Sequence, residues 1–183
     1  SDTVEAAFKK WFGDSKVVDA DGNPLVVYHG SDRDVKVFRT SNALGTGSFF
    51  SASPDVASSY GPTVYPVYLS MKTPLIVDWD GNNWNVATDT VQVEGQSSVY
   101  DFIGKLSGST NDVVRAARNI SDAILEETGE RYYDGVIIRN VVDRGSRVWT
   151  EDMIEGASSV SDVYVVFDSA QVKSVNNRGT YDA

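Results

Sequence analysis

Cysteine is absent from the sequence, and histidine occurs once, as His29. Without thiols the chain cannot form disulfide bonds or bind a metal through cysteine, and a single imidazole excludes zinc sites built from several histidines. The acidic residues Asp14, Asp19 and Asp21 lack the glutamate at the twelfth position that completes a calcium loop. We therefore expect chemistry without a bound metal ion.

Long apolar runs and basic charge are also scarce. No stretch approaches the roughly 18 apolar residues that cross a bilayer, and no signal peptide opens the chain. The formal net charge is −10, so the surface repels phosphate backbones and anionic lipids. We expect neither nonspecific nucleic-acid binding nor membrane association. The arginines of the second half are expected to be scattered, solvated charges: Arg115, Arg118, Arg131, Arg139, Arg144 and Arg147.

The rest of the composition is typical of one globular domain. Hydrophobic residues make up 41% of the chain and charged residues 23%, and the length of 183 residues suits a single core. Nine tyrosines and four tryptophans serve either a core or a flat ligand. Because the first residue is Ser1, we expect residues 1–183 to be a single domain excised from a longer polypeptide.

Capping residues and apolar spacing predict four helices. Phe8, Trp11 and Phe12 lie on one face of the first, and Ser53 followed by Pro54 has the composition of a helix start. The expected helices run from Asp2 or Thr3 to Gly13, from Ser53 to Tyr60, from Ser97 or Ser98 past Leu106, and from Thr110 to Gly129.

Between these helices, short apolar or alternating runs predict strands. They are Leu25–Tyr28, Phe49–Ser51, Val64–Met71, Leu75–Val77, Val136–Ile138, Val163–Phe167 and Gln171–Val175. The first of them leads into His29, Gly30 and Ser31. With no internal repeat and no linker, one α+β domain is the simplest account.

Four segments of the sequence resemble segments of the ADP-ribosyltransferases of the diphtheria-toxin and poly(ADP-ribose) polymerase group. They are residues 27–31 (Val-Tyr-His-Gly-Ser), 47–51 (Gly-Ser-Phe-Phe-Ser), 55–60 (Asp-Val-Ala-Ser-Ser-Tyr) and 164–174. In that group a strand ends in His-Gly, two aromatic residues follow eleven positions apart, and a late strand starts with a catalytic glutamate. Here Phe49 and Tyr60 are eleven residues apart.

The sequence is still more similar to the domains of this kind in polyvalent proteins of phages and other mobile elements. The similarity lies in residues 8–19, 133–138, 171–174 and 177–181. It implies an α+β, ADP-ribosyltransferase-like fold with two small packed β-sheets, flanking helices and an NAD cleft between them. It also implies a cytoplasmic location, including the cytoplasm of a host cell, and a host protein as the acceptor.

The resemblance assigns a role to each matched residue, with NAD as the substrate. The His29 ring would hydrogen-bond a ribose hydroxyl, and the Gly30 backbone would pair with the nicotinamide carboxamide. Phe49 and Tyr60 would hold the nicotinamide ring between them, although Phe49 lacks the hydroxyl of the tyrosine usual there. Ser31 completes the expected cofactor-binding set, and His29 and Tyr60 also count as catalytic candidates.

The catalytic glutamate is where the sequence departs from the family. Val163 or Tyr164 occupies its place by spacing, and we take Val163 as the position of the family glutamate. Asp162 is adjacent, but alternation along a strand points it to the other face. Acidic residues of the preceding loop are candidate substitutes, with Glu155 the one included in the catalytic set: Glu151, Asp152 and Glu155.

These features together predict a mono-ADP-ribosyltransferase that modifies a macromolecular acceptor. A missing glutamate argues against polymer synthesis and leaves two alternatives open. One is a catalytically silent module that binds NAD, ADP-ribose or a partner protein, and the other is an NAD glycohydrolase that uses water as the acceptor. Gln171 and Lys173 belong to the resemblance, and we expect Gln171 to be structural.

Overall fold

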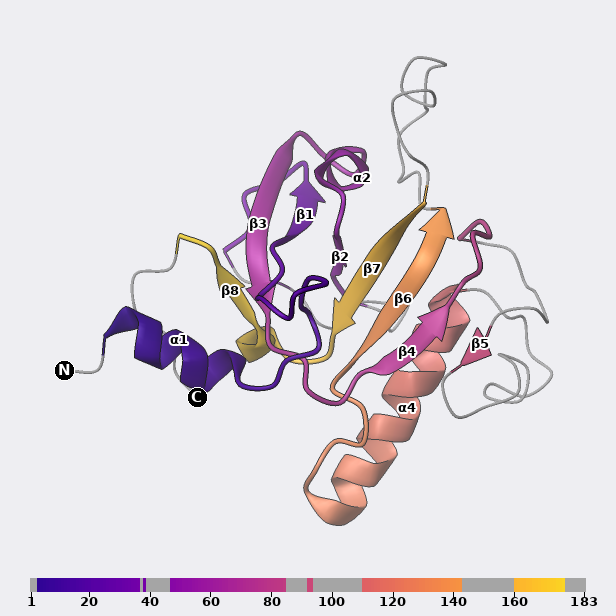
Figure 1. Cartoon of the computed structure of the whole chain (residues 1–183). Helices are drawn as coiled ribbons and strands as arrows, with labels where there is room; N and C mark the ends of the chain where they lie inside the picture. The colour runs from indigo at the N-terminus through magenta and orange to yellow at the C-terminus, as the bar shows by residue number, and fades with distance from the viewer. Residues whose placement is uncertain are drawn as a thin grey trace.

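The computed structural model describes residues 3–36, 38, 47–84, 92–93, 110–142 and 160–176 (Figure 1). The elements, in chain order, are α1 (Val4–Phe12), β1 (Val27–Ser31), β2 (Phe49–Ser51), α2 (Pro54–Ser58), β3 (Thr63–Leu69), β4 (Leu75–Asp78), β5 (Gln92–Val93), α4 (Thr110–Thr128), β6 (Gly135–Val142), β7 (Val160–Val166), the 3₁₀ helix η1 (Ser169–Gln171) and β8 (Val172–Ser174). The expected α+β class is confirmed.

The eight strands within the described residues belong to one sheet, in the order β5-β4-β6-β7-β2-β1-β3-β8, where two packed sheets were expected. The correction comes from β2, which has only three residues and a partner on each side. It pairs with β7 at three positions and with β1 at one, Tyr28 opposite Ser51. This short strand joins the halves that Figure 1 shows around β3 and β6 into one hydrogen-bonded layer.

Two hydrophobic clusters lie on the opposite faces of the sheet. Val163 and Val165 of β7 belong to the cluster that also contains residues of α4, whereas Tyr164 and Val166 belong to the other. Successive side chains of a strand point to opposite faces, so β7 contributes to both cores. Its complete burial from Val163 to Val166 explains why it reads in the sequence as an uninterrupted apolar run.

Three residues predicted to bound helices do so: Thr3 and Ser53 stand at helix starts, and Gly129 stands at a helix end. The Thr3 hydroxyl accepts the Ala6 N–H at the start of α1, and the Ser53 hydroxyl accepts the Val56 N–H at the start of α2. Gly129, with φ of 79°, follows α4 in the left-handed conformation that favours glycine. The helix expected after Ser98 lies outside the described residues. No helix in the described ranges is both long and apolar enough to span a membrane.

Gln171 has the structural role that its position in the sequence predicts. Its side-chain oxygen accepts the N–H groups of Phe167 (3.1 Å) and Asp168 (2.8 Å), while its side-chain nitrogen donates to the carbonyls of Ser70 (3.0 Å) and Asp134 (2.9 Å). One amide thereby holds the ends of β3 and β7 and the start of β6 together. The strand expected from Gln171 therefore begins one residue later, at Val172.

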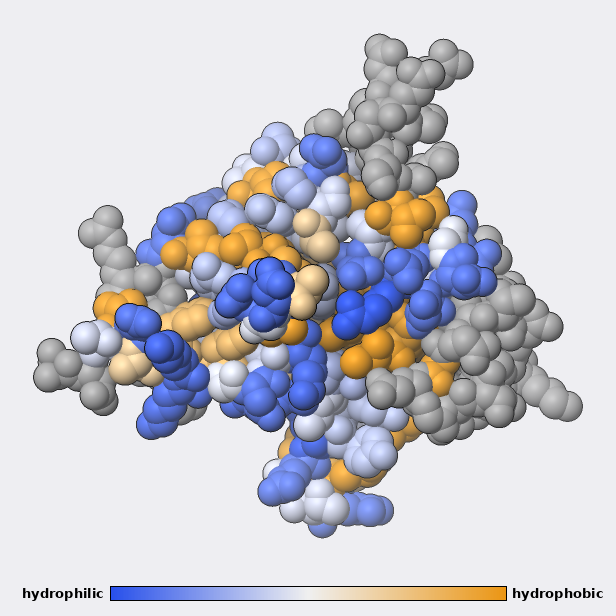
Figure 2. Space-filling model, in the orientation of Figure 1, coloured by the Kyte–Doolittle hydropathy of each residue, from blue (hydrophilic) through white to orange (hydrophobic). Residues whose placement is uncertain are grey.

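Hydrophilic residues are spread over the face in Figure 2, with separate apolar areas between them.

The described arginines of the second half are paired rather than freely solvated. Arg131 binds Asp122 at 2.7 Å, and Arg139 binds Asp162 at 3.4 Å. Arg115 pairs with Asp112, and Arg118 lies over the Phe167 ring at 5.2 Å. Arg144 and Arg147 lie outside the described residues.

Candidate functional site

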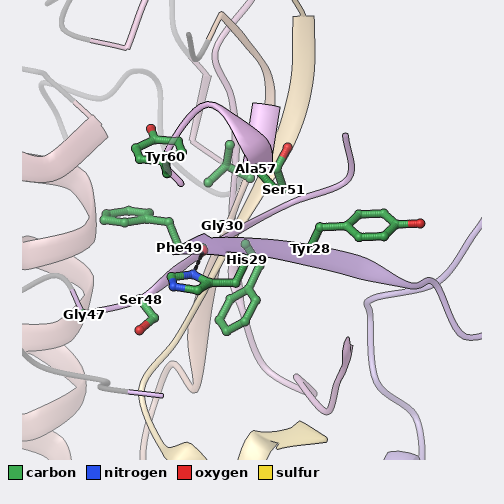
Figure 3. A pocket seen from close by; sticks show the side chains of 11 residues that line it. Tyr28, His29, Gly30, Gly47, Ser48, Phe49, Ser51, Ala57 and Tyr60 are labelled. Carbon is green, nitrogen blue, oxygen red and sulfur yellow. Dashed lines mark hydrogen bonds between the residues drawn. The ribbon is translucent and has the colours of Figure 1, made fainter. Parts of the chain in front are cut away.

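A cavity of about 240 Å³ opens where β1, β2, α2 and β7 meet (Figure 3). It is lined by Tyr28, His29, Gly30, Gly47, Ser48, Phe49, Phe50, Ser51, Ala57, Tyr60 and Val163. The volume falls below the roughly 300–1,000 Å³ of pockets for drug-sized ligands. It therefore suits one flat ring, with the remainder of a larger ligand lying outside it.

The short helix α2 reaches the cavity because two glycines allow its close approach to β1. A Cβ on Gly30 would lie 1.6 Å from the Ala57 carbonyl oxygen, and one on Gly61 would lie 2.1 Å from the Ser31 carbonyl carbon. No real side chain tolerates such distances, so both positions require glycine. The close approach places Tyr60, just after α2, at the cavity wall.

The Gly30 backbone is directed toward the cavity side of β1. Tyr28 lies opposite Pro66 of β3, and a proline has no N–H to contribute to the ladder. The Pro66 carbonyl instead accepts the Val175 N–H on the far side of β3. Because backbone direction alternates along an antiparallel pair, Tyr28 and Gly30 direct their N–H and C=O groups toward β2. The register of β1 with β2 includes only Tyr28, so Gly30 lies where the two strands separate.

His29 lines the cavity with its ring held in one orientation. Its Nδ1 lies 2.7 Å from the Phe49 carbonyl oxygen, and because that oxygen can only accept, Nδ1 carries the proton. Burial lowers the pKa of His29, and the hydrogen bond to Phe49 opposes this shift only in part. The imidazole is therefore neutral at pH 7, and Nε2 has a lone pair that accepts a hydrogen bond.

The aromatic residues Phe49 and Tyr60 reach the cavity from two different elements, and Figure 3 shows both rings on the same side of Gly30. Phe49 packs against Trp84, with ring centroids 5.2 Å apart and planes at 82°. Tyr60 is 40% exposed and lies at the opening. The Phe50 side chain points to the opposite face of β2 and is buried in the core.

Val163 lies in the same cavity and is only 1% exposed. The position matched to the family glutamate thus faces the expected ligand ring, although its own side chain is apolar. Asp162 points to the other face, as predicted, where it accepts the Asn140 N–H at 3.0 Å and pairs with Arg139. The described residues that line the cavity include no carboxylate. Glu155, like Glu151 and Asp152, lies outside the described residues.

Ser31 is the one expected binding residue that does not line this cavity. Its hydroxyl accepts the Arg33 N–H at 3.1 Å, in the turn that leaves β1. Sequence reasoning assigned no role to Ser51, which lines the cavity, or to Trp84, which packs against Phe49. Ser51 follows Phe49 by two residues, so strand alternation alone places it on the same face. Trp84 is an aromatic residue in a polar stretch, and the sequence contains no sign of its contact with Phe49.

A known protein family matches most of the chain. Residues 19–181 match the family described as "ADP-Ribosyltransferase in polyvalent proteins". The chain belongs to this family. ADP-ribosyltransferases use NAD as their substrate. No group of three or more potential metal-ligating side chains occurs among the residues that the structure describes.

Two further comparisons add little to the identification of this ADP-ribosyltransferase domain. The solved structure titled "Crystal structure of an anti-CRISPR protein" is similar to it at 15% sequence identity, with a TM-score of 0.40. The similar region covers 82% of this chain and 94% of that chain. No curated protein shows significant similarity to the domain.

Proposed function

We propose that this domain transfers a single ADP-ribose from NAD to a macromolecular acceptor, with a host protein as the expected acceptor, and releases nicotinamide. One observation carries the proposal. His29, Gly30, Phe49, Tyr60 and Val163, each matched to a family position in the sequence, line one cavity of a size that suits a single ring.

The reaction breaks the bond between the ribose C1′ and the nicotinamide nitrogen, and the bonding electrons go to that nitrogen. The ribose then develops oxocarbenium character, and the acceptor's nucleophile attacks it. Phe49 and Tyr60 would stack on the ring, a contact of about 1 kcal/mol beyond area burial. The Gly30 backbone groups would pair with the carboxamide, and Nε2 of His29 would accept a hydrogen bond from a ribose hydroxyl.

The apolar side chain of Val163 supports transfer of one unit rather than polymer synthesis, because the family glutamate favours chain extension. The same observation favours a second candidate, a catalytically silent module that binds NAD, ADP-ribose or a partner protein. The developing ribose charge meets no carboxylate among the described lining residues. A transferase would then need an acid from residues 151–155 or from the acceptor itself.

The deciding experiment measures nicotinamide release from NAD by the purified domain, alone and with bacterial lysate. His29→Ala provides the control. Release that needs both the lysate and His29 supports a transferase, and labelled ADP-ribose then identifies the acceptor. Release without lysate supports a glycohydrolase or self-modification. Absence of release under both conditions, with NAD still bound, contradicts the transferase and supports the silent module.

A further inference from the structure

A second cavity, the edge cavity, lies beside β3 and β8, at the β8 end of the sheet in Figure 1. Its volume is about 690 Å³, within the roughly 300–1,000 Å³ of pockets that hold small ligands. The described residues that line it fall within three segments, 35–38, 64–67 and 169–176. None of them lines the cavity of Figure 3, so the edge cavity is a separate site.

The apolar part of this lining belongs to the hydrophobic core. Val67 of β3 and Val172 of β8 are both core residues, and the Phe38 side chain packs against the same cluster. The Phe38 ring also meets the Tyr65 ring, with centroids 6.0 Å apart and planes at 86°. Because packing fixes these side chains, the edge cavity offers a preformed apolar surface to a flat ligand.

Tyr65 holds the segment that forms one wall of the edge cavity. Its hydroxyl accepts the Val35 N–H at 2.9 Å, and its oxygen lies 3.3 Å from the Arg33 carbonyl oxygen. The same wall borders the NAD-site candidate His29, whose ring meets the Phe38 ring edge-on at 5.2 Å. A ligand packed on Phe38 therefore contacts the ring that supports His29.

The chain segments around the edge cavity are basic, although the protein as a whole is acidic. The formal net charge is −10, yet residues 35–54, 56–77 and 169–181 contain no aspartate and no glutamate. Two lysines, Lys36 and Lys173, line the edge cavity. This separation of charge favours an anion over a cation at the site.

The acids that border these segments in the sequence are Asp34 and Asp168, and neither lines the edge cavity. Asp168 accepts the Ala170 N–H at 2.8 Å, where it caps the helix η1. Asp34 has a carboxylate oxygen 3.4 Å from the Tyr65 hydroxyl oxygen. Both carboxylates thus have partners of their own next to the cavity.

We propose that the edge cavity binds a small anionic ligand with a flat apolar body. The body packs on Phe38, Val67 and Val172. The anionic group lies toward Lys36, and Lys173 adds a second positive charge. The inference goes beyond the proposed function and does not rest on it, because no residue assigned to NAD lines the edge cavity.

The test compares two ligands of nearly the same shape. Naphthalene-2-sulfonate is an anion at pH 7, whereas naphthalene-2-sulfonamide is neutral. Titration of the isotope-labelled domain with each ligand, followed by backbone amide chemical shifts, gives both the dissociation constant and the place of binding. We expect the sulfonate to bind about three- to tenfold more tightly, because two partly solvated lysines favour the anion.

The chemical shifts show which cavity the ligand occupies. Binding in the edge cavity should move the amide signals of Val67 and Ser174 most, since both residues line it. Changes centred instead on Gly30 and Phe49 would place the ligand in the cavity of Figure 3 and overturn the inference.

Lys36→Gln tests the source of the preference, and Lys10→Gln on α1 is the matched control. Both lysines are exposed, so neither change disturbs the core. Lys36→Gln should weaken sulfonate binding by about two- to fivefold and leave sulfonamide binding unchanged, as expected for one exposed charge pair. Lys10→Gln removes the same charge outside the lining and should change neither affinity.

Three further results would overturn the inference. They are equal affinity of the wild type for both ligands, equal effects of Lys36→Gln and Lys10→Gln, and no binding of either ligand. All of them leave the proposed function standing, because its own test is nicotinamide release from NAD.

Discussion

At the scale of single residues, the His29 ring makes a structural hydrogen bond and, under the proposed function, also binds the ligand. Nδ1 donates to the Phe49 carbonyl, and this hydrogen bond holds β1 to β2 just beyond the one position where their ladder pairs. Under the proposed function, Nε2 accepts a hydrogen bond from the ligand. Because each nitrogen has a separate partner, the two roles can be separated by substitution.

His29→Asn should weaken NAD binding by about fivefold while it preserves the fold. The asparagine amide can still donate to the Phe49 carbonyl, but it places no acceptor where Nε2 lies, and one hydrogen bond contributes about 1 kcal/mol. Calorimetry gives the affinity, and thermal unfolding gives the stability. His29→Ala loses both contacts and should abolish NAD binding. Normal NAD affinity in both variants would show that His29 does not contact the ligand.

Val163→Glu should raise nicotinamide release by at least about tenfold. A carboxylate at this position would lie beside the positive charge that develops on the ribose, and oriented charges of this kind are large terms in catalysis. The rate of release from NAD is the measurement, with Val163→Gln as the uncharged control. An unchanged rate in a folded Val163→Glu protein would contradict the placement of the family glutamate at this position.

At the scale of elements, the site depends on how closely α2 packs on β1. Gly30→Ala should destabilise the domain by about 1–3 kcal/mol, because its Cβ meets the Ala57 carbonyl, a backbone atom that cannot rotate away. It should also weaken NAD binding, since α2 must withdraw with Tyr60. Gly22→Ala is the control. It should lose stability only because Gly22 has φ of 82°, since nothing lies within 4 Å of the added Cβ. Equal losses of affinity in both variants would argue against this packing.

Trp84 connects the aromatic wall to two other elements. Its N–H donates to the Val142 carbonyl at the end of β6, and its carbonyl accepts the N–H and the hydroxyl of Thr110 at the start of α4. The ring then packs against Phe49. Trp84 is therefore a positioning residue for the ring that is expected to contact nicotinamide.

Trp84→Ala should raise the KM for NAD about three- to tenfold and leave kcat unchanged, because a perpendicular ring pair is worth about 0.5–1.5 kcal/mol. Trp84→Phe retains an aromatic ring and should restore most of the affinity. Steady-state nicotinamide release measures both constants. A fall in melting temperature with no change in KM would show that Trp84 only supports the fold.

At the scale of the whole molecule, the one histidine makes stability depend on pH. The unfolded chain takes up a proton near the ordinary histidine pKa of 6.5, whereas burial keeps the pKa of folded His29 below that value. Between these two pKa values the unfolded state binds more protons, so stability falls as the pH drops below 6.5. Urea unfolding from pH 7.5 downward measures the slope. His29→Asn should flatten it, and an unchanged slope would place its origin elsewhere.

Much of the fold follows from local signals in the sequence. Thr3, Ser53 and Gly129 define helix ends through hydrogen bonds and backbone conformation that involve only neighbouring residues. Strand alternation correctly placed Asp162 on the face opposite to Val163. The strand β1 extends beyond its predicted end, Tyr28, because β3 pairs with it as far as Ser31. That pairing joins segments that are distant in the sequence, so no pattern within residues 27–31 indicates where the strand ends.

The sequence by itself determined the α+β class, the family and the helix ends, because spacing and capping are properties of the chain. Only the tertiary structure decided that the strands form one sheet, since that depends on the two neighbours of β2. It also decided that Trp84 supports Phe49 and that the described cavity wall is uncharged. These are contacts between residues far apart in sequence, and they exist only once the chain has folded.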